Sequence, residues 1–398
     1  MSCMSRNVRL FQTLLIKTTI YPTIEPKPMS APTQFHALTI ARVDAEAGGA
    51  IAVTFDVPVQ LREVFAFTPG QFLTLRATID GQDIRRSYSI CSAPHRWRTV
   101  GTVQVGIRPV EGGVFSNWAV QHLHAGDSFQ VMPPQGRFCV QRPRAFHRVG
   151  FAAGSGITPI LSIMASTLQD QPESKFTLVY GNRRMDSVMF NEALQDLKDA
   201  YPDRLTLIHI LSRQAQEVPL LEGRIDGEKV KAIMQTLLPV KSMDEVFICG
   251  PEGMIEATEK ALLDAGARKE RVYAERFVSQ STGKPATSQN KGDKPRASAK
   301  TTQAQPSVAL TVRLDGKSYD FGISKDDLVL DAALDQGLDL PYSCKGGVCC
   351  TCRAKVIEGQ VEMAKNFTLS EEEITQGFVL SCQARAKTPR VVISFDER

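Results

Sequence analysis

Residues 344–352 read CKGGVCCTC, and this stretch decides the interpretation of the C-terminal part of the chain. Cys344, Cys349 and Cys352 have the spacing C-x4-C-x2-C, and Cys382 lies thirty residues further along. Four thiolates at this spacing are typical of a 2Fe–2S cluster. The alternative is a zinc site, but zinc sites usually contain two C-x2–4-C pairs, whereas this chain has one lopsided triplet. The spacing therefore predicts that these four cysteines hold a 2Fe–2S cluster.

The small residues inside this stretch suit a loop that wraps closely around a cluster. Gly346 and Gly347 carry no side chain that would obstruct the backbone, so backbone N–H groups can point at the cluster sulfurs and stabilise their negative charge. Cys350 falls within the C-x2-C spacer. Its side chain is therefore predicted to point away from the cluster.

The composition is that of an ordinary globular protein. Of the 398 residues, 42% are hydrophobic and 23% are charged, which excludes a wholly disordered, collagen-like or coiled-coil chain. The apolar stretch from Leu10 to Ile16 is too short to cross a membrane, and no signal-peptide cleavage site follows it. A net charge of +4 without a concentrated basic face argues against nucleic-acid binding. We therefore expect a cytoplasmic protein, in which clustered cysteines indicate a metal site rather than disulfides.

A polar segment divides the chain. Residues 278–306 are rich in Ser, Thr, Gln, Lys, Pro and Ala and cannot bury enough apolar surface to order themselves, so they are predicted to form a flexible linker. Residues 33–145 contain short β-rich runs separated by turns, which predicts an antiparallel barrel or sandwich. Residues 146–277 alternate strands with helices, which predicts an α/β domain with a parallel sheet. Residues 307–398 form a third domain, and residues 1–32 are interpreted as a disordered leader or a start-site extension.

Two motifs in the β-rich domain favour a flavin site. The motif RSYS at residues 86–89 lies on a predicted strand and offers a cation beside an aromatic ring. The motif EGGVFS at residues 111–116 leads into a predicted helix, and the free N–H groups of a helix N-terminus bind phosphate. The first motif alone also fits an ordinary edge strand with a polar face. Together they favour a flavin dinucleotide.

The α/β domain contains the elements of a dinucleotide site. The motif GSGITP at residues 154–159 follows a predicted strand and opens a helix, with Pro159 at the first helical position. It departs from the G-x-G-x-x-G fingerprint because Pro159 replaces the third glycine. The motif CGP at residues 249–251 supports the site, since ligands bind at the carboxyl ends of parallel strands. Ser212 and Arg213 close another strand and favour NADPH over NADH by binding a ribose 2′-phosphate, although an exposed loop pair is the alternative.

From about residue 33 to residue 398, the chain resembles the ferredoxin–NADP reductase superfamily. The resemblance rests on RSYS, EGG-x2-S, GSGITP, YGNR at 180–183, CGP and ERF at 275–277, while CKGGVC-x2-C and LSCQ at 380–383 resemble a plant-type ferredoxin. It implies an FAD-binding antiparallel β-barrel, an α/β parallel-sheet NAD(P)-binding domain and an α+β β-grasp 2Fe–2S ferredoxin domain. The domain order and these strings are most similar to those of the reductase subunits of phenylacetyl-CoA epoxidases.

The resemblance also implies roles for individual residues in the flavin site. Arg86 would hold the flavin diphosphate, Tyr88 would stack on the isoalloxazine ring, and Ser89 would contact flavin N5. Gly113 and Ser116 would cradle the pyrophosphate.

In the nucleotide site, the resemblance implies that Thr158 and Cys249 flank the nicotinamide and that Glu275 supports the hydride-transfer geometry. Ser212 with Arg213 would bind the 2′-phosphate. Ser89, Cys249 and Glu275 are therefore the predicted catalytic residues. The resemblance adds the following cofactor contacts: Ile90, Val105, Ile107, Arg108, Gly112, Gly154, Gly156, Ile157, Pro159, Tyr180, Gly181, Asn182, Arg183, Gly250, Pro251 and Phe277.

The function implied by the resemblance is an NADPH-dependent oxidoreductase of phenylacetate degradation. Electrons would pass from NADPH through FAD and the 2Fe–2S cluster to the oxygenase component of a di-iron phenylacetyl-CoA epoxidase. Because NADPH gives two electrons as hydride and the cluster accepts one at a time, a flavin must stand between them. Reductases of other multicomponent oxygenases, such as phenol or toluene hydroxylases and ring-hydroxylating dioxygenases, carry the same motifs. A non-catalytic iron–sulfur redox sensor is a further alternative, against which the intact GSGITP and CGP motifs argue.

Overall fold

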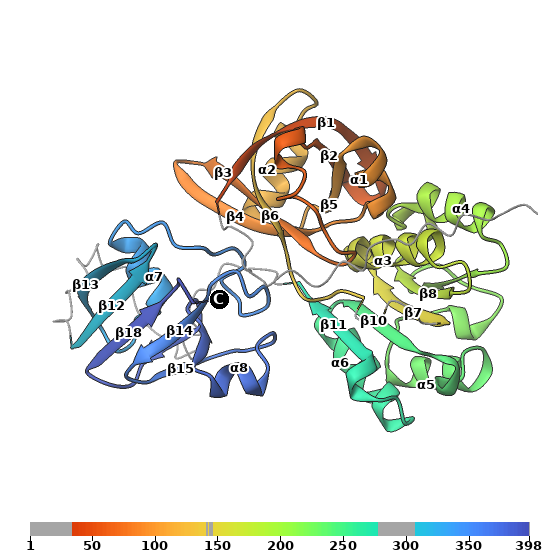
Figure 1. Ribbon diagram of the computed structural model, residues 1–398. Helices are drawn as coiled ribbons and strands as arrows, with labels where there is room; N and C mark the ends of the chain where they lie inside the picture. Colours follow the sequence, from red (N-terminus) through yellow and green to blue (C-terminus); the bar gives the residue numbers. More distant parts are fainter. Residues whose placement is uncertain (1–33, 141, 143–145, 278–306, 398) are drawn as a thin grey trace, which may run out of the picture. The chain divides into compact units, whose positions relative to one another are not determined.

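The computed structural model describes residues 34–140, 142, 146–277 and 307–397. The predicted leader over residues 1–32 and the predicted linker over residues 278–306 lie outside these described residues. The described residues form three large sheets, one for each predicted domain (Figure 1). None of the described helices is long and apolar enough to cross a membrane.

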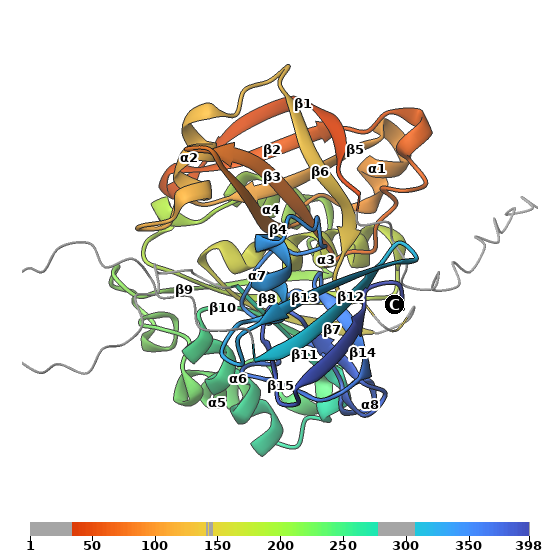
Figure 2. The ribbon, with the colours of Figure 1, turned by 90° about the vertical axis from the view of Figure 1, so that its left-hand side faces the viewer.

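The first domain is an antiparallel β-barrel. Its strands are β1 (His36–Glu46), β2 (Ala50–Asp56), β3 (Phe72–Ile79), β4 (Gln82–Ser89), β5 (Thr102–Ile107) and β6 (Ser128–Gln135), in the order β4-β3-β6-β1-β2-β5. A bridge between Ile90 and Val105 joins the chain after β4 to β5, so the two edges of the sheet meet and close it. Helices α1 (Pro94–Val100) and α2 (Val114–His122) lie at opposite sides of the barrel as seen in Figure 2. Of the two predicted architectures, the structure shows the barrel rather than the sandwich.

Local sequence explains the barrel strands. Alternate residues such as Leu73 and Leu75 point into an interior filled by aliphatic and aromatic side chains. Strands β3 and β4 are joined by Asp80-Gly81, whose φ angles of 50° and 76° suit the tight turn that follows the twist of a hairpin.

The second domain has a five-stranded parallel sheet. Its strands are β7 (His147–Ala153), β8 (Lys175–Asn182), β9 (Leu205–Leu211), β10 (Glu245–Gly250) and β11 (Val272–Arg276), in the order β11-β10-β7-β8-β9. Helices α3 (Ile157–Asp170) and α4 (Asn191–Ala200) contribute to the core on one face, and α5 (Gly227–Thr236) and α6 (Glu252–Asp264) contribute to the core on the other (Figure 1). The strand order reverses between β7 and β10. Ligands of such sheets bind in the crevice at this reversal.

The third domain is built on a mixed sheet. Its five-stranded sheet has the order β13-β12-β18-β14-β16, with a separate pair β15-β17. The strands are β12 (Val308–Leu314), β13 (Lys317–Ile323), β14 (Arg353–Glu358), β15 (Val361–Met363), β16 (Phe378–Leu380), β17 (Ala384–Ala386) and β18 (Arg390–Ser394). Helices α7 (Val329–Asp335) and α8 (Glu371–Thr375) complete the domain, and Val329, Leu330 and Ala333 of α7 lie in its core. The predicted fold class is confirmed in all three domains.

One predicted boundary in the second domain is wrong by two residues. Residues Gly154–Gly156 already wind as a short 3-10 turn, and α3 begins at Ile157. Pro159 is therefore the third residue of the helix rather than the first. It remains within the first turn, where its missing N–H group has no helical partner to lose.

Candidate functional site

The four cysteines predicted as cluster ligands come together in the third domain. Three of them precede strand β14, and the sheet brings Cys382, in the turn after β16, back to the loop that carries the other three. The Cys349 thiol donates a hydrogen bond to Cys344 and lowers the pKa of Cys344 to about 6. The Cys352 thiol likewise donates to Cys382 and lowers its pKa. The two thiols of each pair thus lie within hydrogen-bond reach of each other, with the negative charge favoured on Cys344 and on Cys382.

This arrangement in two pairs fits a two-iron cluster. Among the described residues, no three His, Cys, Asp or Glu side chains converge as they would around a single metal ion. A tetrahedral zinc site would need its four ligands around one point. In a 2Fe–2S cluster four thiolates are shared between two irons, so two per iron suffice. The two pairs of cysteines are therefore compatible with four ligands shared between two irons.

The backbone of the cysteine loop is arranged around the sulfur atoms. The N–H of Gly346 donates to Cys344 Sγ at 3.3 Å, and the side-chain amide of Gln383 donates to Cys382 Sγ at 3.6 Å. Gly347 has a φ of 79°, and a Cβ there would meet the carbonyl oxygen of Lys365 at 3.1 Å. The loop thus needs glycine at this point to bring N–H donors to the sulfurs.

Cys350 lies apart from the four paired cysteines. Its backbone has a φ of 57°, in the left-handed region. Its thiol, whose pKa is raised by burial, lies within the influence of the charges of Arg137, Glu373 and Arg353 rather than of the other thiols. That Cys350 is not a cluster ligand stays a prediction.

Arg86 and Tyr88, two of the residues predicted to bind flavin, lie on one face of strand β4, whereas Ser89, the predicted contact of flavin N5, lies on the other. Arg86 and Tyr88 alternate with Arg85, Ser87 and Ser89, so they point to the opposite side of the strand. The Tyr88 ring lies 5.7 Å from that of Phe115, at the start of helix α2. Burial raises the pKa of the Tyr88 hydroxyl, so the ring is neutral.

The turn before helix α2 fits a phosphate group. Gly113 is the residue that precedes the helix, and no side chain caps the first N–H groups there. Gly112 has a φ of 71° with open space around its Cα, whereas a Cβ at Gly113 would meet Val110 Cγ2 at 2.5 Å and Ser116 Oγ at 2.7 Å. The turn thus combines open space beside Gly112 with a helix N-terminus that no side chain caps, which suits an anion.

Three predicted catalytic residues are linked across two domains. Ser89 Oγ, at the end of β4, donates a hydrogen bond to Glu275 Oε2 at 3.1 Å. Glu275 on β11 is paired in register with Cys249 on β10. The two strands end together at the carboxyl edge of the parallel sheet, so the hydrogen bond joins the end of β4 to that edge.

The carboxyl group of Glu275 is held in an unusual environment. Burial raises its pKa to about 8, and the hydrogen bond from Ser89 partly offsets this increase. The carboxyl is therefore mostly protonated at neutral pH. A protonated carboxyl at this position can hold or give a proton.

The GSG turn packs closely on the end of β10. A Cβ on Gly156 would meet the carbonyl oxygen of Cys249 at 2.1 Å, so only glycine fits. Thr158 lies against β5 of the barrel, since a Cβ on Gly106 would meet its Cγ2 at 2.8 Å. The Tyr180 hydroxyl donates to the carbonyl of Gly154 at 2.9 Å. These contacts fix the turn between β7 and β10, at the reversal of strand order.

Arginines gather at the ends of the next two strands. The N–H of Arg213 donates to the carbonyl of Arg183 at 2.8 Å, and Ser212 Oγ donates to the carbonyl of Asn182 at 3.3 Å. Arg183 and Arg213 are both exposed. Two guanidinium groups beside a hydroxyl at a carboxyl edge suit a phosphate monoester.

The remaining predicted contacts fall into different places. The following side chains are fully buried in cores, so only their backbone can face a cofactor: Ile90, Val105, Ile107 and Ile157. Gly181 lies on β8, and Gly250 with Pro251 leads into α6. Arg108 lies beside the GSG turn, 2.9 Å from the position of a Cβ on Gly154. Phe277 follows β11 and is exposed.

Sequence reasoning missed Arg85, which is almost fully buried next to the RSYS motif. Arg85 binds Asp339 and the carbonyl of Leu340, in the segment that leads to Cys344. Ser87 meets Ser343 at 2.7 Å between their hydroxyl oxygens. The strand period of two could have placed Arg85 and Ser87 on the face of Ser89, but no local signal identified their partners.

Comparison with known families agrees with the three domains. The oxidoreductase FAD-binding domain matches residues 47–140, the oxidoreductase NAD-binding domain matches residues 151–260, and the 2Fe-2S iron-sulfur cluster binding domain matches residues 312–387. The first match covers the barrel except β1, the second covers the parallel sheet except the start of β7 and all of β11, and the third covers the four paired cysteines. The chain is therefore an oxidoreductase with sites for FAD, a pyridine nucleotide and a 2Fe–2S cluster.

Similar proteins span nearly the whole chain. A component of the 1,2-phenylacetyl-CoA epoxidase of Escherichia coli is 45% identical over 92% of this chain and 99% of its own length. The ferredoxin reductase component of a 3-ketosteroid-9-alpha-monooxygenase from Rhodococcus rhodochrous is 36% identical over 90% of this chain and 96% of its own length. The solved structure of phthalate dioxygenase reductase has the same fold, with a TM-score of 0.55 at 21% identity, and the match covers 91% of this chain and 98% of that one.

Proposed function

This chain belongs to the family of ferredoxin reductase components of multicomponent oxygenases, and we propose that it passes electrons from NADPH to the oxygenase component of a phenylacetyl-CoA epoxidase. The observation that carries the proposal is the linked set Ser89, Glu275 and Cys249, which joins the predicted flavin strand to the edge of the nucleotide sheet. The similarity to the epoxidase component of Escherichia coli supports the choice of oxygenase.

The residues of the site suit the transfer of hydride. FAD, when bound, takes up the two electrons of a hydride and releases them one at a time. Tyr88 and the turn at Gly113 would hold its ring and its diphosphate, while Thr158 and Cys249 would hold the nicotinamide against it. Orientation of the two rings is the main contribution of the protein. The half-buried carboxyl of Glu275, linked to Ser89, would hold a proton beside the flavin ring.

NADPH is proposed as the electron donor rather than NADH. Its 2′-phosphate would lie at Ser212, Arg183 and Arg213, at the ends of β8 and β9. Charge-assisted hydrogen bonds from guanidinium to phosphate are absent with NADH, which carries a hydroxyl there. The support is the clustering of these exposed groups at the carboxyl edge of the sheet.

Reconstitution tests the proposal. Holoprotein is mixed with the oxygenase component of a phenylacetyl-CoA epoxidase, phenylacetyl-CoA, O2 and NADPH, and formation of the epoxide is followed by mass spectrometry. We expect product in step with NADPH consumption. A 3-ketosteroid 9α-hydroxylase oxygenase with its steroid serves as the matched control, and equal or better coupling there would overturn the proposed partner. If the holoprotein fails to catalyse the reduction of ferricyanide by NADPH, a non-catalytic redox sensor is favoured instead.

A further inference from the structure

Strand β4 presents a second row of side chains, each of which has a partner outside the barrel. Ser89 bonds Glu275 of the nucleotide sheet, Ser87 bonds Ser343, and Arg85 bonds Asp339. Strand alternation puts all three on the face opposite Arg86 and Tyr88. We propose that Arg85 is a positioning residue that holds the cluster-bearing loop against the flavin strand and so sets the distance over which electrons pass.

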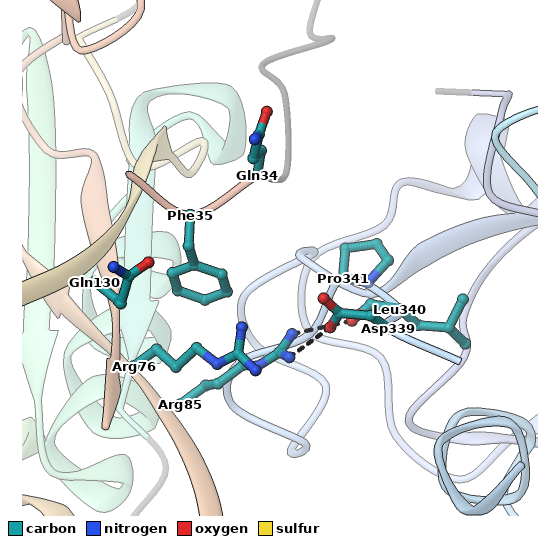
Figure 3. A pocket seen from close by; sticks show the side chains of 8 residues that line it. All are labelled: Gln34, Phe35, Arg76, Arg85, Gln130, Asp339, Leu340 and Pro341. Atoms are coloured by element: carbon teal, nitrogen blue, oxygen red, sulfur yellow. Dashed lines mark hydrogen bonds and ion pairs between the residues drawn. The ribbon is translucent and has the colours of Figure 1, made fainter. Parts of the chain in front are cut away.

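The side chain of Arg85 is almost fully buried and makes several hydrogen bonds in this contact. Its side chain is 4% exposed. Nη2 donates to Asp339 Oδ1 at 2.6 Å, and Nη1 donates to the carbonyl oxygen of Leu340 at 3.1 Å (Figure 3). Nε donates to Asp83 Oδ2 at 3.2 Å. The guanidinium also lies between two aromatic rings, 5.1 Å from the centroid of Phe35 and 4.4 Å from that of Tyr342. Such a planar, multiply bonded arginine defines one geometry.

The contact acts on the cluster through a short stretch of chain. Asp339 and Leu340 stand five and four residues before Cys344, and Ser343 directly precedes it. Ser343 is buried and bonds Ser87, two residues along β4 from Arg85. Two points of attachment on one strand thus fix the approach to the first cluster ligand. This step rests on the proposed assignment of the flavin to β4 and of the cluster to the paired cysteines.

The contact is polar and therefore able to separate. A cavity of about 220 Å³ lies beside Arg85 and is lined by Gln34, Phe35, Arg76, Arg85, Gln130, Asp339, Leu340 and Pro341 (Figure 3). It has room for several water molecules. A second ion pair between the same two domains joins Arg137 to Glu373, with 2.6 Å from Nη2 to Oε1. Polar contacts of this kind between domains are specific without being permanent.

Removal of the Arg85 side chain leaves neither Asp339 nor Asp83 buried without a partner. Asp339 is 71% exposed and returns to water, and Asp83 keeps its ion pair with Arg76 at 2.9 Å. The variant Arg85→Ala therefore removes the contact without burying an unpaired charge. Arg76→Ala is the matched control, because it removes an arginine from the same Asp83, in the same cavity, without a hydrogen bond or ion pair to Asp339.

The experiment separates the two electron transfers in holoprotein. Anaerobic stopped-flow with NADPH follows flavin bleaching first and cluster bleaching second, and small-angle X-ray scattering of the same samples reports the radius of gyration without any turnover. In Arg85→Ala we expect cluster reduction to slow roughly ten- to a hundredfold, the loss matching one charged hydrogen-bond contact. Flavin reduction should stay unchanged, and the radius of gyration should rise. Arg76→Ala should match wild type in all three.

If Arg85→Ala fails to fold, Asp339→Ala gives a second test. The Asp339 side chain is 71% exposed, so its removal should not disturb folding. It should slow cluster reduction in the same direction. Wild-type rates of cluster reduction in both variants would overturn the positioning role, whatever the scattering shows. If NADPH leaves the cluster of the wild-type protein oxidised, the proposed function itself fails, which is a different outcome.

Discussion

The raised pKa of Glu275 predicts how flavin reduction depends on pH. Hydride transfer brings negative charge to the flavin ring, and an ionised carboxylate linked to Ser89 beside it would oppose that transfer. Because burial raises the pKa of Glu275 to about 8, its neutral form predominates below that pH and its charged form above it. The protonated fraction then falls about tenfold between pH 7 and pH 9, so the rate of flavin reduction should fall about tenfold over the same interval.

The assay is stopped-flow reduction of FAD by NADPH between pH 6 and 9.5. Glu275→Gln keeps a neutral, hydrogen-bonding side chain at every pH, so its profile should be nearly flat. Glu270→Gln, five residues earlier and exposed, should retain the wild-type profile. A wild-type rate that stays level from pH 7 to 9, or a Glu275→Gln variant that keeps the fall, would refute the reasoning.

The same carboxyl affects stability. Its pKa is raised from 4.5 to about 8 on folding, so between these values the unfolded chain releases a proton that the folded protein keeps. The free energy of unfolding should therefore fall as the pH rises through this window. Urea unfolding at several pH values should show a weaker fall in Glu275→Gln.

Three further substitutions address the other parts of the account. Cys352→Ser should abolish the visible absorption of the cluster and leave FAD bound, whereas Cys350→Ser should leave the spectrum intact; loss of the cluster in both would make the ligand assignment wrong. Arg213→Ala should lower kcat/KM for NADPH roughly ten- to a hundredfold in steady-state kinetics and leave that for NADH nearly unchanged, and equal losses would exclude a 2′-phosphate contact. Arg148 and Glu245 are fully buried and joined at 2.8 Å, so Arg148→Ala should lower the free energy of unfolding by about 3–5 kcal/mol in urea titrations, and a neutral effect would contradict the pairing.

Short-range patterns predicted much of this molecule. The ligand spacing from Cys344 to Cys352 is a property of nine consecutive residues, and strand alternation along β4 is visible in eight. The start of α3 was misplaced because Gly154–Gly156 already turns before the helix, and proline preference alone does not register that.

Contacts between distant segments were harder to predict. The hydrogen bond from Arg85 to Asp339 joins residues 254 positions apart, and the one from Ser89 to Glu275 joins residues 186 apart. Glu275 was identified only through the family resemblance, since a lone glutamate after a strand carries no signal of its own. The family resemblance did not include Arg85, and its role in the contact could be identified only from the structure.

Anaerobic titration of the holoprotein with NADPH, followed by electron paramagnetic resonance, tests the electron path most directly. A 2Fe–2S cluster held by four thiolates gives a signal only after it has gained one electron. We expect substoichiometric NADPH to produce this signal in wild-type protein, in samples that contain two irons per chain. A bleached flavin with a silent cluster, which then responds to dithionite alone, would contradict the path from nucleotide through flavin to cluster.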